Sequence, residues 1–144
     1  MSRFDDEAAA SGVTISADIV PVPPVRGSAR DLKLLLRNLV DNAVRYTRPD
    51  GRVEVEVFPE DGDVVLRVRD TGIGIPSRDL PRIFERFYRV DRARSRETGG
   101  TGLGLSIVRH VAENHGGTVT AESELGRGST FEVRLPASRL SSGA

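Results

Sequence analysis

The chain has 144 residues, of which 38% are hydrophobic and 29% charged, and its 21 basic and 21 acidic residues give a formal net charge of zero. This composition is typical of one globular domain, and the balanced charge gives no reason to expect nucleic acid or an acidic membrane surface as a partner. The absence of cysteine excludes disulfides, cysteine metal sites and thiol nucleophiles.

The first half of the chain predicts a strand, a helix and a hairpin. Residues 1–12 are small and polar and are expected to be a tail or linker before a domain over 13–136. Residues 13–19 alternate with period 2, which predicts a strand, and residues 28–46 place apolar side chains at helical spacing. VEVEV at 53–57 and VVLRVRD at 64–70 predict two strands joined as a hairpin through EDGD.

The second half predicts a loop, a helix and two strands. Residues 77–101 are rich in arginine and have little apolar periodicity, so a lid-like loop is expected. A helix is predicted from about 102–104 to 115, then strands at 118–123 and 129–135, with a tail at 137–144. The element order predicts an α+β fold, a two-layer sandwich with a mixed, mostly antiparallel sheet and helices on one face. No run of about 18 apolar residues occurs, so direct membrane insertion is not expected.

Three polar side chains form a stripe along the first predicted helix. Asn38, Asn42 and Arg45 are spaced i, i+4 and i+7, which places them on the shoulder of the apolar face. Amide oxygens can bind Mg²⁺, which shares its ligands with substrate phosphates. The alternative is that the two asparagines only cover the helix surface.

The segment DTGIGIP, residues 70–76, follows the second hairpin strand. By period 2, Asp70 shares the face of Val64, Leu66 and Val68, where a carboxylate is costly unless something hydrogen-bonds it. The amino group of an adenine would satisfy it, and the glycines behind it would let a flat ligand approach closely. A simple turn and the active-site corner of an aspartic protease are the alternatives; the rest of the chain lacks the all-β pattern of such a protease.

A glycine cluster, GGTGLGLS at 99–106, precedes the second predicted helix. Free N–H groups and the helix dipole attract phosphate at such a position. The segment lacks the strand context of a dinucleotide fingerprint and the lysine of a P-loop. A flexible hinge is the alternative, and the two interpretations are compatible.

Taken together, these motifs resemble the ATP-binding catalytic domain of sensor histidine kinases, in the gyrase, Hsp90, histidine kinase and MutL superfamily with the Bergerat fold. LLRNLVDNAVRYT at 35–47 is similar to the N box and DTGIGIP to the G1 box. FERFYR at 84–89 is similar to the F box and GGTGLGLSIV at 99–108 to the G2 box. The resemblance covers residues 13–136, and four boxes in the correct order make it specific.

The resemblance implies ATP and Mg²⁺ as ligands and assigns roles within the site. Asn42 would be the principal Mg²⁺ ligand, with Asn38 as a second ligand or phosphate contact. Arg45 and Arg89 would neutralise phosphate charge during catalysis, and Asp70 would accept from the adenine amino group. The other implied nucleotide contacts are Tyr46, Gly72, Gly74, Ile75, Gly100, Thr101, Gly102, Leu103, Gly104, Leu105 and Thr130, the last through a water.

The family's phosphoacceptor histidine has no counterpart here, because His110 and His115 both follow the G2 box and are expected to be structural. The resemblance therefore implies transfer of the γ-phosphoryl group to a histidine on a separate dimerisation domain, and indirectly to a response regulator. It implies a cytoplasmic domain of a parent sensor in the inner or plasma membrane. A serine kinase of the anti-sigma type and a nucleotide-binding module without transfer activity are the rival interpretations.

Overall fold

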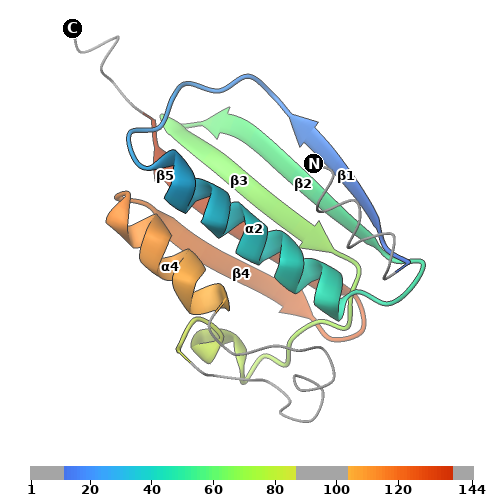
Figure 1. Ribbon diagram of the computed structural model, residues 1–144. Helices are drawn as coiled ribbons and strands as arrows, with labels where there is room; N and C mark the ends of the chain where they lie inside the picture. Colours follow the sequence, from blue (N-terminus) through green and yellow to red (C-terminus); the bar gives the residue numbers. More distant parts are fainter. Residues whose placement is uncertain (1–11, 87–103, 138–144) are drawn as a thin grey trace, which may run out of the picture.

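The computed structural model describes residues 12–86 and 104–137 (Figure 1). The predicted strands and helices are present there, together with a short 3-10 turn. In chain order the elements are β1 (Thr14–Ile19), α2 (Ala29–Tyr46), β2 (Arg52–Glu60), β3 (Asp63–Asp70), η1 (Leu80–Arg82), α4 (Gly104–Asn114), β4 (Thr118–Glu124) and β5 (Gly128–Pro136).

The strands form one mixed sheet in the order β1-β2-β3-β5-β4. β1 runs parallel to β2, since the two are connected through α2, and the other neighbours are antiparallel. The predicted hairpin between β2 and β3 is confirmed. It turns at Asp61 (φ 53°) and Gly62 (φ 83°), both in the left-handed region that tight hairpins require.

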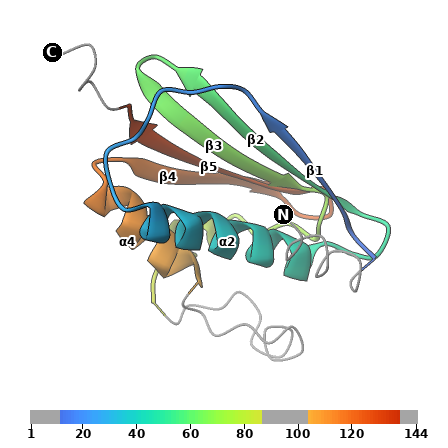
Figure 2. The same cartoon turned by 45° about the horizontal axis from the view of Figure 1, so that its top comes forward.

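Both helices cover the same face of the sheet, where they lie side by side (Figures 1 and 2). The core lies between the two layers. Leu35 and Leu39 from α2, Val108 from α4, and Val68 and Phe131 from the strands are at most 2% exposed. The predicted two-layer α+β sandwich with helices on one face is therefore confirmed, and this helix-covered face also carries the functional candidates.

His115 joins the start of α2 to the end of α4. Its Nε2 accepts a hydrogen bond from the Ser28 N–H at 3.1 Å, and its Nδ1 lies 2.8 Å from the Val111 carbonyl oxygen. Ser28 in turn caps α2, because its hydroxyl accepts from the Asp31 N–H at 3.2 Å. The two helices are thus tied together at one end, and His115 has the structural role expected of it.

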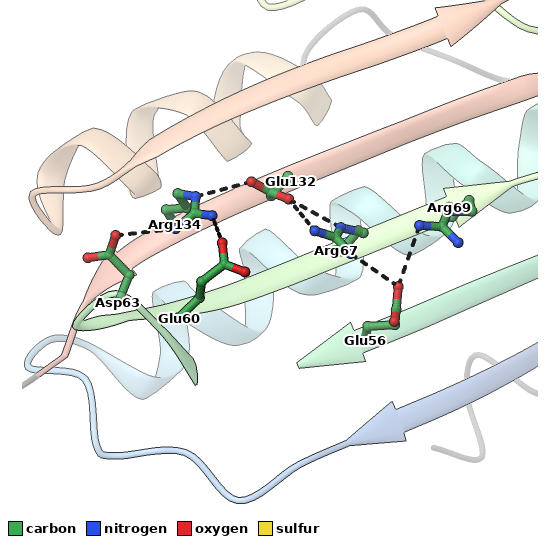
Figure 3. A network of polar contacts seen from close by, with 7 residues as sticks. All are labelled: Glu56, Glu60, Asp63, Arg67, Arg69, Glu132 and Arg134. Carbon is green, nitrogen blue, oxygen red and sulfur yellow. Dashed lines mark hydrogen bonds and ion pairs between the residues drawn. The ribbon is translucent and has the colours of Figure 1, made fainter. Parts of the chain in front are cut away.

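The opposite face of the sheet carries a network of charged side chains (Figure 3). Glu132 lies between Arg67, whose Nη2 is 2.8 Å from Oε1, and Arg134, whose Nε is 3.1 Å from Oε2. The hydrogen bond from Arg67 is the main reason that the pKa of Glu132 is lowered. Further ion pairs connect this centre with Glu56, Glu60, Asp63 and Arg69.

Within the described ranges, no helix is long and apolar enough to cross a membrane.

Candidate functional site

Asp70 is a buried carboxylate at the end of β3. It is 6% exposed, which confirms the period-2 prediction that it faces inward. Its Oδ1 accepts two backbone hydrogen bonds, from the Gly72 N–H at 2.9 Å and the Ser129 N–H at 3.2 Å. Among the described residues, no donor contacts Oδ2. Burial raises the pKa of Asp70, and the two backbone hydrogen bonds only partly oppose this effect.

The loop after Asp70 is held between the end of α2 and the turn that joins β4 to β5. The Ile73 N–H donates to the Tyr46 carbonyl at 3.1 Å, and the Ile73 carbonyl accepts from the Gly126 N–H at 2.9 Å. The Ile75 N–H donates to the Ser123 hydroxyl at 2.7 Å. Three hydrogen bonds from two directions thus fix the loop beside the buried carboxylate.

The two glycines of this loop are required by packing within the protein. A Cβ at Gly72 would overlap the carbonyl oxygen of Tyr46. Gly74 has φ +77°, and a Cβ there would overlap the backbone of Glu124 and Leu125. Packing against the protein's own backbone is therefore one reason for these glycines, and the close approach of a ligand stays a prediction.

The predicted stripe on α2 lies on the shoulder of the core. Asn38 and Asn42 are half-buried and Arg45 is exposed. The Asn38 Nδ2 donates to the Leu34 carbonyl at 2.9 Å, which leaves Oδ1 without a donor among the described residues. A Cβ built on Gly104 would lie 3.2 Å from this Oδ1. The first turn of α4 therefore lies beside the amide oxygen of Asn38.

These two amides fit a magnesium site shared with phosphate. Asn38 Oδ1 is directed toward the start of α4, and the side chain of Asn42 makes no hydrogen bond with another described residue. Neutral oxygen donors of this kind suit a hard cation that keeps waters and takes its remaining ligands from a nucleotide. Residues 12–86 and 104–137 contain no group of three His, Cys, Asp or Glu side chains that could hold a metal by themselves.

The structure places some of the other predicted contacts and leaves others undescribed. Tyr46, Ile75 and Leu105 are half-buried, and the latter two pack against the core. Phe84 of the F box meets the ring of Phe131 edge-on at 6.1 Å, as expected of an anchor in the core. Arg89, Gly100, Thr101, Gly102 and Leu103 lie outside the described residues, so their roles remain predictions.

Thr130 does not fit the role that the resemblance implied for it. Side chains alternate along β5, and Phe131 and Val133 belong to the core, so Thr130 shares the opposite face with Glu132. Ser129 is the residue paired directly with Asp70 across β3 and β5, and it is 7% exposed. The residue of β5 that lies on the same face as Asp70 is thus one position earlier than the one expected. The alternation of Phe131, Val133 and Leu135 was the signal that would have identified Ser129.

Comparisons with known proteins agree with this geometry. Residues 27–139 match the family described as histidine kinase-, DNA gyrase B-, and HSP90-like ATPases. The phosphate regulon sensor protein PhoR of Pseudomonas aeruginosa is 44% identical over 131 residues, which are 90% of this chain and 30% of that protein. The sensor-like histidine kinase SenX3 of Mycolicibacterium smegmatis is 43% identical over 136 residues, which are 94% of this chain and 35% of that protein.

Solved structures show the same likeness. The mycobacterial sensor histidine kinase MprB superposes with a TM-score of 0.80 at 30% identity, covering 94% of this chain and 91% of that one. Full-length ShkA in complex with AMPPNP has a TM-score of 0.80 at 33% identity, covering 94% of this chain and 28% of that one.

The chain therefore belongs to the family of histidine kinase-, DNA gyrase B-, and HSP90-like ATPases. Within that family its fold and sequence are those of the ATP-binding domain of a sensor histidine kinase. It spans about a third of the length of the PhoR and SenX3 proteins named above.

Proposed function

We propose that this domain binds Mg-ATP and supplies its γ-phosphoryl group to a histidine on a separate dimerisation domain in two-component signalling. The observation that carries the proposal is the buried carboxylate of Asp70, which has one oxygen bound to backbone and the other without a described donor. A carboxylate in a largely buried position that keeps one oxygen available as an acceptor favours a ligand that donates to that oxygen.

The base of the nucleotide would lie at the end of β3. Asp70 Oδ2 would accept from the exocyclic amino group of adenine, and the loop of Gly72 to Ile75 would form one wall. Because the hydrogen bonds of this loop to Tyr46 and Ser123 are already formed, the wall is organised before the nucleotide arrives. Tyr46, at the last turn of α2, would contribute to the same end of the site.

The phosphates would lie between α2 and the first turn of α4. Asn42 and Asn38 would hold Mg²⁺, and the bound ion would neutralise part of the phosphate charge. Gly104 brings the start of α4 close to Asn38, and the dipole at a helix N-terminus favours an anion. Arg45 and Arg89 would add positive charge as the γ-phosphoryl group leaves.

The phosphate acceptor would lie on another domain of the parent kinase. In this chain His115 has both ring nitrogens engaged with Val111 and Ser28, and His110 lies on the exposed surface of α4 near Asn114. A response regulator would then receive the phosphoryl group. The parent protein would be a sensor of the inner or plasma membrane, with this domain in the cytoplasm.

A transfer experiment tests the proposal. The chain is incubated with γ-labelled ATP, Mg²⁺ and the dimerisation domain of its parent kinase, with that domain's acceptor histidine replaced by alanine as the control. We expect label on the unmodified dimerisation domain alone, stable in base and lost in acid. Acid-stable label would favour the serine kinase alternative, and ATP binding without any transfer would favour a regulatory module.

A further inference from the structure

The hydroxyl of Ser123 lies at the centre of the contacts that surround the proposed base end of the site. Ser123 is half-buried on β4, with its side chain toward the helix-covered face. Its Oγ lies 2.7 Å from the Ile75 nitrogen, 3.0 Å from the Gly128 carbonyl oxygen and 2.8 Å from the Ser129 Oγ. One hydroxyl thus connects the loop after β3, the start of β5 and the serine paired with Asp70.

The direction of each hydrogen bond follows from the chemistry of the partners. Ile75 N–H can only donate, so it takes one lone pair of Ser123 Oγ. The Gly128 carbonyl can only accept, so the single proton of Ser123 must point to it. The contact with Ser129 then becomes a hydrogen bond only if the Ser129 hydroxyl donates to the second lone pair of Ser123. This is the one arrangement that makes all three contacts hydrogen bonds.

This arrangement determines what Ser129 presents to a ligand. With its proton held by Ser123, the Ser129 oxygen keeps its lone pairs, so it is an acceptor. Ser129 is paired across the sheet with Asp70, whose Oδ2 is also an acceptor. The end of the site therefore offers two acceptors and no hydroxyl donor. Such a pair favours an amino group on the base and disfavours a carbonyl oxygen at the same position.

We propose that Ser123 is a positioning residue for base recognition, which holds Ser129 as an acceptor beside Asp70 and so makes the site prefer adenine over guanine nucleotides. The inference rests on the proposed function, since it assumes that a nucleotide base lies at this end of the site. Without Ser123, the Ser129 hydroxyl can rotate and donate, which would suit the carbonyl oxygen of guanine.

The test compares affinities for ATP and GTP, each with Mg²⁺, by titration calorimetry on the whole chain. For Ser123→Ala we expect the ratio of ATP to GTP affinity to fall by about tenfold. This is the change in affinity that corresponds to one hydrogen bond to the base turning from favourable to unfavourable. Ser123→Thr keeps the hydroxyl and should keep the ratio within about twofold of the original. Thr120→Ala is the matched control, because it removes an exposed hydroxyl from the same strand.

The outcomes distinguish a failure of the role inferred for Ser123 from a failure of the proposed function of the domain. An unchanged ratio in folded Ser123→Ala, or an equal loss of affinity for both nucleotides, would overturn the role of Ser123. If Ser123→Ala does not fold, Ser129→Ala takes its place: a reduced ratio supports the inference and an unchanged ratio refutes it. If the original chain binds neither nucleotide, the proposed function itself fails. This result is distinct from any result with the variants, because it is measured on the original chain alone.

Discussion

Replacing Asp70 with asparagine should weaken nucleotide binding and stabilise the domain at the same time. The variant keeps an oxygen that can accept from the Gly72 and Ser129 N–H groups. Its amide nitrogen then takes the place of Oδ2, so a donor faces the amino group of the base. The substitution therefore preserves the local backbone contacts and reverses the polarity of the proposed ligand contact.

The size of the binding effect follows from the loss of a hydrogen bond to a charged acceptor. Such bonds contribute about 1.5–3 kcal/mol, and about 1.4 kcal/mol corresponds to a tenfold change in affinity. We expect the dissociation constant for ATP to rise by roughly 10- to 150-fold. Binding of GTP, which presents a carbonyl oxygen at that position, should fall less than binding of ATP.

The stability effect has the opposite sign and depends on pH. Burial raises the pKa of Asp70 in the folded domain above its ordinary value of 3.8. The folded state then binds more protons than the unfolded state between the two pKa values, so the original domain loses stability as the pH rises through that interval. The asparagine side chain does not titrate in this range, so the variant has no such loss of stability. The free energy of unfolding of the variant should therefore exceed that of the original by an amount that grows as the pH rises from acidic values. This difference should level off above the pKa of Asp70 in the folded domain.

Two measurements on the same samples check this prediction. Calorimetric titration with ATP gives the affinity, and urea unfolding at pH values from about 3 to 7 gives the free energy of unfolding. A variant that binds ATP as tightly as the original would refute the proposed contact. A variant that is less stable than the original at neutral pH would refute the statement that desolvation dominates at Asp70.

Three further substitutions test other parts of the structure. Asn42→Ala should remove the effect of Mg²⁺ on ATP affinity while Mg-free binding changes by less than about threefold, and a persisting Mg²⁺ effect would exclude Asn42 as the main ligand. Gly72→Ala should cost about 1–3 kcal/mol in urea unfolding because its Cβ overlaps the Tyr46 carbonyl, and an unchanged midpoint would contradict that packing. Glu132→Gln should cost about 1 kcal/mol at pH 7, measured in the same way. Its deficit should shrink as the pH falls through the lowered pKa of Glu132, and a pH-independent deficit would contradict the role of its charge.

Much of the site could be predicted because strand periodicity carries direct information about side-chain direction. The alternation of Val64, Leu66 and Val68 was sufficient to place Asp70 on the core side. Helical spacing likewise placed Asn38 and Asn42 on the shoulder of α2. Each of these predictions concerns a single helix or strand, and within one element the local periodicity determines which way a side chain points.

The failures concern relations between elements. The choice of Thr130 over Ser129 was an error of one position, and in a strand one position exchanges the two faces of the sheet. The packing reasons for Gly72 and Gly74 depend on Tyr46 and Glu124, which are distant in sequence, so no local pattern could reveal them. The hydroxyl of Ser123 was missed for the same reason, because its partners come from three separate segments.

The central claim is that Mg-ATP binds between the end of β3 and the first turn of α4. The most direct measurement is an amide NMR titration of the whole chain with a non-hydrolysable ATP analogue, with and without Mg²⁺. We predict saturable shifts at Gly72 and Ser129 in both titrations, and Mg-dependent shifts at Asn42 and Gly104. Shifts confined to the charged face around Glu132, or no saturable shifts at all, would contradict the claim.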